Sequence, residues 1–422
     1  MARIISVHAR EVLDSRGNPT VEVEIGCDDG SHGRAMVPSG ASTGRAEACE
    51  LRDGEADRYD GRGVRKAVTA VREQLAPLVM GLDPAEQAAL DRRLIDADGT
   101  PQKSRLGANA LLGVSLAAAH AAAKSAGLPL YEHFHLLWRE ATGAASALKL
   151  PMLMVNMISG GLHAGGNLEF QDFLFVPHGA PDYPTALEWT VRVYRRLGEL
   201  LAQAGYEGRL VGDEGGYGPR LASNAQAAEF VMRAIEAARL RPGEDASLAI
   251  DVASTHFFDG THYRLKATGE ARLTSSEMID QLEQLVRRVP IVSLEDGLAE
   301  EDWAGWQELT RRLGGSVRLI GDDLLVTNAA RVQKAVDLVA ANAVLIKVNQ
   351  VGTLTETLQT MSLARSQAWM CVVSARSGET EDTTMADLAV ATAAEQIKIG
   401  SVVRSERLAK YNRLLRIAEE FA

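Results

Sequence analysis

Four segments decide the fold of this 422-residue chain: SLAID (247–251), IVSLED (291–296), RLIGDD (318–323) and AVLIKVNQ (343–350). Each is a short apolar run that ends in charged or polar residues. Helix-sized amphipathic stretches separate them, of which 328–340 is one example. Repeated strand–helix units predict a parallel sheet, because a parallel connection needs a long crossover that is usually a helix. The segments therefore predict an α/β fold.

The same pattern continues to the end of the chain. The predicted strands are 248–251, 290–295, 318–322, 343–348, 370–374 and 396–400, with helices such as 276–289 and 328–340 between them. This number of units fits a closed, TIM-like barrel of about eight strands. An open, doubly wound sheet is the competing architecture.

The first third of the chain has a different pattern. Residues 4–12 and 20–25 alternate apolar and polar side chains, which predicts half-buried strands, and helical stretches follow at 63–80, 84–96 and 108–126. The pattern changes after a stretch at 141–147, and 422 residues exceed what one hydrophobic core usually serves. We predict an N-terminal α+β capping domain at 1–140, with a lid loop at 38–44, and a β/α-barrel catalytic domain at 141–422.

Composition excludes several classes of partner. The net charge of −11 argues against nucleic acid and membrane surfaces, since both attract basic patches. The polar start argues against a signal peptide, and no apolar run reaches the roughly 18 residues of a membrane span. The three cysteines are far apart in the sequence and have no metal-binding or redox spacing, as expected of isolated thiols in a reducing cytoplasm.

Acidic residues end three of the predicted strands. Asp251, Glu295 and Asp322 each lie at a carboxyl-terminal tip, and a barrel builds its active site at that face. Three converging carboxylates repel one another unless a hard cation holds them, and oxygen ligands suit Mg²⁺. The alternative is that each acid caps the helix that follows its strand.

A lysine occupies the next strand end. Lys347 lies within an apolar segment, where an unpaired ammonium would be costly. Beside a bound metal, burial and positive charge would both lower its pKa and make it a usable general base. The alternative is that Lys347 only neutralises the neighbouring carboxylates.

Further candidates lie in loops. Arg376, Ser377 and Lys398 could donate hydrogen bonds to a phosphate or carboxylate, and Glu214 lies in the glycine-rich VGDEGGYGP. The loop PSGASTG (38–44) has the composition of a lid and lacks the lysine of a phosphate-binding P-loop. His163, in GGLHAGG, would by itself more often be structural than catalytic.

Together, the motifs DSRGNPT, VPSGASTG, KSRLGANA, VGDEGGYGP, SLEDGL, GDDLLVTN, LIKVNQVGTLTETL, RSGETED and RSERLAKYNRLLRI resemble those of the enolase (phosphopyruvate hydratase) family. The resemblance runs from about residue 2 to residue 421. It implies a small N-terminal α+β domain, an eight-stranded barrel with an irregular start, and a homodimer or higher homo-oligomer. It also implies a glycolytic carbon–oxygen lyase with two Mg²⁺ per active site, which interconverts 2-phosphoglycerate and phosphoenolpyruvate.

The resemblance also assigns roles to residues at matching motif positions. It implies that the tightly held Mg²⁺ is bound by Asp251, Glu295 and Asp322, and the second Mg²⁺ by Ser42 in the lid. Lys347 matches the base that takes the α-proton, and Glu214 matches the acid that assists loss of the 3-hydroxyl group. The positions that match substrate-binding residues are His163, Gln171, Arg376, Ser377 and Lys398.

The sequence departs from the family pattern in the same region. Ala375 replaces a substrate-side histidine, Asp172 replaces a glutamate that supports proton transfer, and Ser159 replaces an asparagine. Three hypotheses follow: an enolase isozyme, a paralogue with the same chemistry on another substrate, or a non-catalytic binding or surface protein. A carboxyphosphonoenolpyruvate synthase of phosphinate natural-product biosynthesis is an example of the second.

Overall fold

The computed structural model describes residues 2–41, 43–143, 147–266 and 271–421. Its N-terminal part begins with an antiparallel sheet of order β1-β2-β3, formed by β1 (Ile4–Leu13), β2 (Pro19–Cys27) and β3 (His32–Met36). The two predicted strands are therefore confirmed, and β3 is an addition. Helix α4 (Ala108–Ser125) packs on β2 and β3. A Cβ at Gly33 would lie 2.1 Å from the carbonyl oxygen of Ala117, so this close packing requires a glycine.

The three predicted helical stretches of the N-terminal part are present, one of them interrupted, and two further elements, Tyr59–Gly61 and Leu130–Thr142, were not predicted. The elements are η1 (Tyr59–Gly61), α1 (Arg65–Thr69), the π-helical η2 (Ala70–Leu75), α2 (Ala76–Val79), α3 (Gln87–Asp98), α4 and α5 (Leu130–Thr142). The predicted helix 63–80 is interrupted by the π-helical turn. Pro77 follows this turn and has no N–H to donate to an earlier carbonyl, which favours the widened turn before it.

Eight strands form a closed barrel, so the predicted architecture is confirmed and the open sheet is wrong. The order around the barrel is β10-β11-β12-β13-β4-β5-β6-β9. The strands are β4 (Met152–Ser159), β5 (Asp172–Val176), β6 (Ser247–Asp251), β9 (Ile291–Glu295), β10 (Arg318–Gly321), β11 (Ala343–Ile346), β12 (Met370–Ser374) and β13 (Gln396–Gly400). All six strands predicted for this region are present, and β4 and β5 were not predicted.

Strand β5 differs from the predicted parallel arrangement. It runs antiparallel to both neighbours, β4 and β6. A short connection at 160–171 joins β4 to β5 where a helical crossover would otherwise be needed. As a result it is the first residue of β5, Asp172, that pairs with the ends of the adjacent strands, Ser159 and Asp251.

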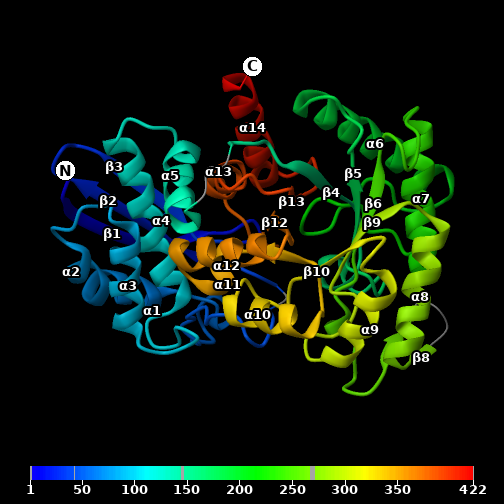
Figure 1. Cartoon of the computed structure of the whole chain (residues 1–422), viewed down its shortest axis with the longest axis horizontal. Coiled ribbons are helices and arrows are strands. Elements are labelled where there is room, and N and C mark those ends of the chain that lie inside the picture. The colour runs from blue at the N-terminus through cyan, green and yellow to red at the C-terminus, as the bar shows by residue number, and fades with distance from the viewer. Residues whose placement is uncertain (1, 42, 144–146, 267–270, 422) are drawn as a thin grey trace.

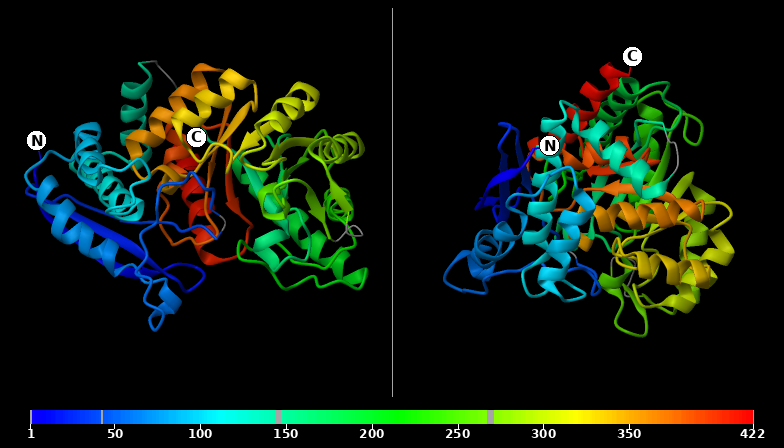
Figure 2. Two further views of the ribbon diagram at one scale, coloured as in Figure 1. Left: turned by 90° about the horizontal axis from the view of Figure 1, so that it is seen from below. Right: turned by 60° about the vertical axis from the view of Figure 1, so that its left-hand side comes forward.

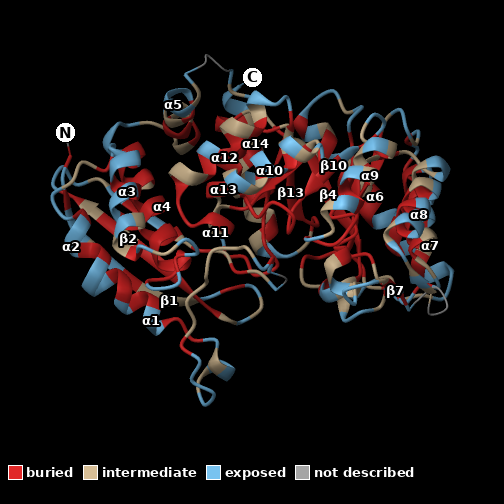
Figure 3. Cartoon of the chain, turned by 60° about the horizontal axis from the view of Figure 1, so that its bottom comes forward, coloured by how far each residue is buried: buried red, intermediate tan, exposed pale blue. Residues whose placement is uncertain are grey.

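Helices cover the outside of the barrel, and most of them have an exposed outer face and a buried inner face, whereas α13 is buried along its whole length (Figures 1 and 3). They are α6 (Tyr183–Gln203), α7 (Asn224–Ala237), α8 (Ser275–Arg288), α9 (Trp303–Leu313), α10 (Ala329–Leu338), α12 (Leu354–Ser366), α13 (Thr384–Ala391) and α14 (Ser405–Glu420). Shorter elements are η3 (Gly161–Ala164), η4 (Ser254–Phe257), α11 (Val348–Val351) and the hairpin of β7 (Tyr263–Leu265) and β8 (Ala271–Leu273). No single helix in the described ranges is long and apolar enough to cross a membrane; only α4 and α5 together pass that test, and they are bent by 108°.

Many hydrogen bonds tie the N-terminal part to the barrel, and two groups of them involve elements described above. The segment after β3 crosses to the barrel (left view of Figure 2), where Ser39 and Gly378 exchange two backbone hydrogen bonds of 2.8 and 2.9 Å. Elsewhere, the first N–H groups of α12 donate to the N-terminal part, from Thr355 to Asp91 (2.9 Å) and from Leu354 to Ser115 (3.0 Å). The buried Asp91 carboxylate and Ser115 hydroxyl thus accept hydrogen bonds from N–H groups that have no partner within α12.

Candidate active site

One small cavity collects most of the predicted site residues. It lies at the strand ends, has a volume of about 10 Å³, and is lined by His163, Gln171, Glu214, Asp251, Lys347, Ser374, Ala375, Arg376, Ser377 and Lys398. Asp172, Glu295 and Asp322 hydrogen-bond to residues of this lining. Ser42 lies outside the described residues. We call this space the inner cavity.

The three predicted metal ligands lie on neighbouring strands. Asp251 ends β6 and is in register with Glu295 at the end of β9, while Asp322 directly follows β10. All three side chains are buried. None of them caps a helix: the side chains that cap the N-termini of α9 and α10 are Asp302 and Asn328. The helix-capping alternative is therefore wrong.

Two lysines supply the counter-charges in this structure. The Lys398 ammonium donates to Asp251 (2.7 Å) and Glu295 (2.8 Å), and the Lys347 ammonium donates to Asp322 (2.5 Å). Burial alone would lower the pKa of Lys347, but the charge of Asp322 outweighs it and raises the pKa. The predicted role of Lys347 as a general base needs the opposite direction, a lowered pKa.

The carboxylates have the chemistry to bind a divalent cation, but the predicted set Asp251, Glu295 and Asp322 is not among the groups of described residues whose ligand atoms all lie within 4.8 Å of one another. Burial and the charge of Asp251 hold the pKa of Glu295 well above its usual range, as expected where carboxylates exceed their counter-charges. Further oxygens lie close: Asp296, Asp322 and Asp323 bring ligand atoms within 4.8 Å of one another. An all-oxygen, anionic donor set is the kind that hard cations such as Mg²⁺ prefer. Asp296 accepts the backbone N–H groups of Asp322 and Asp323 (2.9 and 2.8 Å) and so orients this turn, a role absent from the sequence prediction.

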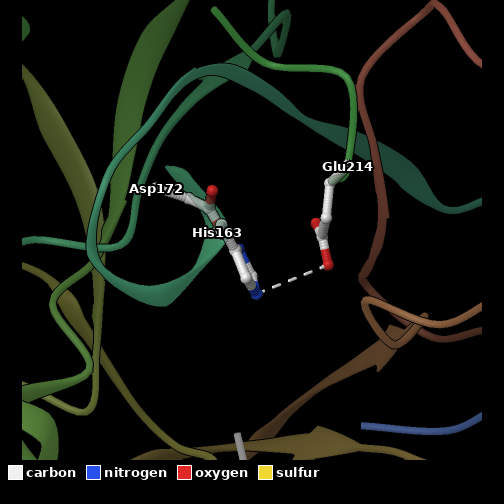
Figure 4. Close-up of side chains that lie close together, drawn as sticks. All are labelled: His163, Asp172 and Glu214. Carbon is white, nitrogen blue, oxygen red and sulfur yellow. Dashed lines mark hydrogen bonds and ion pairs between the residues drawn. The ribbon is translucent and has the colours of Figure 1, made fainter. Parts of the chain in front are cut away.

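A second group of side chains faces the carboxylates across the inner cavity. His163 lies between Asp172 and Glu214, with its Nδ1 3.1 Å from Asp172 and its Nε2 3.9 Å from Glu214 (Figure 4). Burial would lower the pKa of His163, but the charges of Asp172 and then Glu214 raise it to about 9. Burial raises the pKa of Asp172, and the same burial acts on Glu214, whose pKa is nevertheless lowered by the charges of His163 and Arg407. The His163 imidazole thus lies between two carboxyl groups whose pKa values are shifted in opposite directions.

Neighbouring residues hold this group in place. The Asp172 carboxylate accepts hydrogen bonds from the Asn156 amide and from the Ser159 hydroxyl (3.4 Å). Glu214 precedes Gly215, whose φ of 90° favours glycine and whose Cβ, if present, would lie 3.0 Å from the carbonyl oxygen of Val403. The glycine-rich bend is therefore required by close packing against the end of the barrel.

Two of the predicted anion-binding residues, Arg376 and Ser377, come from the segment after β12. The Arg376 guanidinium forms a double hydrogen bond to Glu47 (3.0 and 3.2 Å) and another to Asn349 (3.1 Å). The Ser377 hydroxyl accepts from the backbone N–H of Ala41 (2.8 Å), in the predicted lid loop. The Arg376 guanidinium is thus held by charge-assisted hydrogen bonds to Glu47, and a phosphate could take the place of the Glu47 carboxylate.

Arg407, from α14, holds the same segment in place by hydrogen bonds to its backbone. Its fully buried guanidinium donates to the carbonyl oxygens of Arg376 (2.7 Å), Ser377 (2.8 Å) and Ile399 (2.9 Å). Glu47 and Arg407 were not predicted from the sequence. Glu47 lies 329 residues from its partner Arg376, and Arg407 lies in a different element from the carbonyl groups that it contacts. No local sequence pattern could therefore identify either residue.

All three substituted positions lie in or beside this site, where Ser159 donates to Asp172 as described above. Ala375 lines the inner cavity with a methyl group, and its backbone N–H donates to the carbonyl oxygen of Lys398 (2.8 Å). Asp172, one methylene shorter than glutamate, still reaches His163. At the position where the family has histidine, the wall of the inner cavity is therefore the small apolar side chain of Ala375. At the position where the family has glutamate, Asp172 still forms hydrogen bonds.

Comparison with known proteins gives the same assignment for both parts of the chain. The family model "Enolase, N-terminal domain" matches residues 4–134, and "Enolase, C-terminal TIM barrel domain" matches residues 147–422. A curated protein named "Enolase", from Acidothermus cellulolyticus, is 54% identical over 420 residues, covering 100% of this chain and 95% of the relative. The chain belongs to the enolase family.

Proposed function

We propose that this protein is a carbon–oxygen lyase that reversibly dehydrates 2-phosphoglycerate to phosphoenolpyruvate. The observation that carries the proposal is the arrangement of the inner cavity, where Lys347 and Glu214 lie in one lining with the cations Arg376 and Lys398. An acid, a base and anion-binding groups around one small space suit elimination from a phosphorylated carboxylate. The 54% identity over the whole chain favours this function over a paralogue or a non-catalytic role.

The two steps of the reaction divide between two residues. Lys347, as a neutral amine, takes the proton from the carbon beside the substrate carboxylate. Glu214 acts as the acid: because its pKa is lowered in this structure, it must first take up a proton, which it then gives to the departing 3-hydroxyl group, which leaves as water. We propose that His163 and Asp172 assist Glu214, because the imidazole lies between the two carboxyl groups and can hold a proton there.

The remaining predicted residues position the substrate and the cations. Arg376, Ser377, Gln171 and Lys398 would bind its phosphate and carboxylate groups by charge-assisted hydrogen bonds. Asp251, Glu295 and Asp322 would hold one Mg²⁺, and Ser42 would contribute to a second. When bound, Mg²⁺ would supply positive charge next to the substrate carboxylate.

The wider assignments are also proposals. Residues 1–140 would form a capping domain with the lid at 38–44, and 141–422 the catalytic barrel. The family relationship supports a homodimer or higher homo-oligomer that acts in glycolysis in the cytoplasm.

The first test separates the base from the acid. Purified protein with Mg²⁺ and 2-phosphoglycerate should form phosphoenolpyruvate, followed by its ultraviolet absorbance. Lys347→Ala should abolish exchange of the α-proton with solvent deuterium, whereas Glu214→Gln should retain some exchange and lose dehydration, because Glu214 acts in the second step. Equal loss of exchange in both variants would show that the two roles are misassigned.

A further inference from the structure

A second, larger cavity lies beside the inner cavity and is not part of it. This outer cavity has a volume of about 610 Å³, and its walls come from the turn after β1, the lid segment 39–41, residues 50–62, and the loops that carry Asp213 and Arg404. Four of its side chains are arginines: Arg16, Arg52, Arg62 and Arg404. Glu50 and Asp213 are its acidic side chains.

The two cavities share a wall. Arg16 of the outer cavity donates to the Ser377 hydroxyl of the inner cavity (3.2 Å), and the lid residue Ala41 donates to the same hydroxyl (2.8 Å). Asp213 and Glu214 are consecutive residues on opposite sides of this wall. Arg16 also holds the lid, through the carbonyl oxygens of Ser39 (3.2 Å) and Gly40 (3.3 Å). A ligand in the outer cavity is thus next to the lid and one side chain away from the proposed phosphate-binding residues.

The charge of the outer cavity is opposite to that of the protein. Four guanidinium groups and two carboxylates give it a formal charge of +2, whereas the whole chain carries −11. Arg52 is paired with Glu50 at 2.6 Å. Within the described residues, no carboxylate lies within 4.0 Å of the Arg62 or Arg404 guanidinium, and both side chains are exposed.

Arg62 and Arg404 retain donor capacity for a ligand. Arg62 donates to the Asn18 side chain (3.1 Å) and Arg404 to the carbonyl oxygen of Gly212 (3.1 Å), which leaves other N–H groups of each guanidinium for an anion. Arg404 has a φ of 78°, a backbone conformation that costs free energy for a residue with a side chain. Both groups therefore point to recognition of an anion with several oxygen atoms.

We propose that the outer cavity is an anion-binding antechamber, in which Arg62 and Arg404 bind the phosphate of the incoming substrate before it enters the inner cavity. The proposal rests on the proposed function for the identity of the substrate. A positive cleft on a negative protein concentrates an anionic ligand and raises its rate of association, and this effect decreases as salt screens it.

The test compares two variants with the same change in net charge. Arg62→Gln with Arg404→Gln removes both groups, whereas Arg93→Gln with Arg139→Gln removes two exposed arginines from α3 and α5, outside both cavities. We measure kcat/KM for 2-phosphoglycerate from low to high ionic strength. The first variant should lose about 3- to 10-fold in kcat/KM at low salt, mainly through KM, and show a flatter salt dependence.

The control variant should keep the salt dependence of the natural protein, and Arg62→Lys with Arg404→Lys should restore most of the loss. An equal salt dependence for the Arg62/Arg404 and Arg93/Arg139 variants would overturn the proposal. Calorimetric titration with inorganic phosphate tests the antechamber without turnover: the Arg62/Arg404 variant should bind it more weakly than the control. A natural protein that forms no phosphoenolpyruvate contradicts the proposed function, whereas unchanged phosphate binding in the Arg62/Arg404 variant contradicts the antechamber.

Discussion

In the inner cavity, lysine ammonium groups already neutralise the charge of neighbouring carboxylates. Lys398 and Lys347 pair with the three carboxylates that are the proposed metal ligands. The ammonium groups thus stabilise buried carboxylates that would otherwise repel one another. A cation that binds there must compete with these pairs, so its affinity depends on all three carboxylates.

This arrangement predicts the effect of removing one carboxylate charge. Asp322→Asn keeps the shape of the side chain but weakens the donor set, so Mg²⁺ should bind at least about 10-fold more weakly, a loss of roughly 1.4 kcal/mol. Isothermal calorimetry measures the affinity, and activity should fall in parallel. Asp337→Asn, an exposed change on α10, is the matched control. An unchanged Mg²⁺ affinity in Asp322→Asn would remove Asp322 from the site.

The two departures, Asp172 and Ala375, also have a testable consequence. Asp172→Glu with Ala375→His restores the residues of the family pattern in one pocket. For a protein that dehydrates 2-phosphoglycerate, the restored carboxylate reach and imidazole donor should raise kcat by about 10-fold, or roughly 1.4 kcal/mol of barrier.

Both single variants are needed beside the double variant, because neighbouring sites do not add. Asp172 is fully buried against Asn156 and Ser159, so the longer side chain alone can strain the pocket. A decrease of kcat in every variant would mean that the natural pocket is already fitted to its substrate.

Whether a site residue could be predicted from the sequence depended on the secondary-structure element that carries it. Asp251 and Lys347 could be predicted because they end parallel strands, and such ends meet at one face. Asp172 was found only through the family resemblance: it begins β5, and the strand-end rule does not apply to an antiparallel strand. The pairing of Arg376 with Glu47 joins two loops 329 residues apart, so it depends on how the two parts of the chain pack.

Helix α5 carries a histidine that should make stability depend on pH. His133 is buried, its Nε2 has no hydrogen-bond partner within the described residues, and burial lowers its pKa from 6.5 to about 4. Below pH 6.5 the unfolded chain binds a proton that the folded protein does not, so stability is lost as the pH falls towards 4. The loss from this group between pH 7 and pH 5 should be about 2 kcal/mol.

Replacing His133 removes this contribution. His133→Leu should reduce the decrease in melting temperature between pH 7 and pH 5, measured by thermal unfolding, whereas His8→Gln, at an exposed position, should leave it unchanged. An identical decrease in the natural protein and in His133→Leu would show that other groups control the acid sensitivity.

At the scale of the whole molecule, the two parts complete each other. The lid segment of the N-terminal part forms hydrogen bonds with the barrel at Ser39 and Gly378, and Asp91 and Ser115 bind the first N–H groups of α12. The inner cavity lies under one of these junctions, and the outer cavity is built from both parts. The site is therefore a property of the assembled chain, although most of its proposed catalytic and metal-binding residues can be recognised in the sequence.

Closure of the barrel has a consequence for how the protein is made. Strand β13, which begins at Gln396, pairs with β4, which begins at Met152, so the ring closes between segments that a ribosome makes far apart in time. Pairing of such distant segments pays a large loop-closure entropy and folds slowly. The strands made early must wait with unpaired edges, which other chains can also bind. During synthesis, β4 and the strands beside it should therefore be the part of the nascent chain that most needs protection by chaperones.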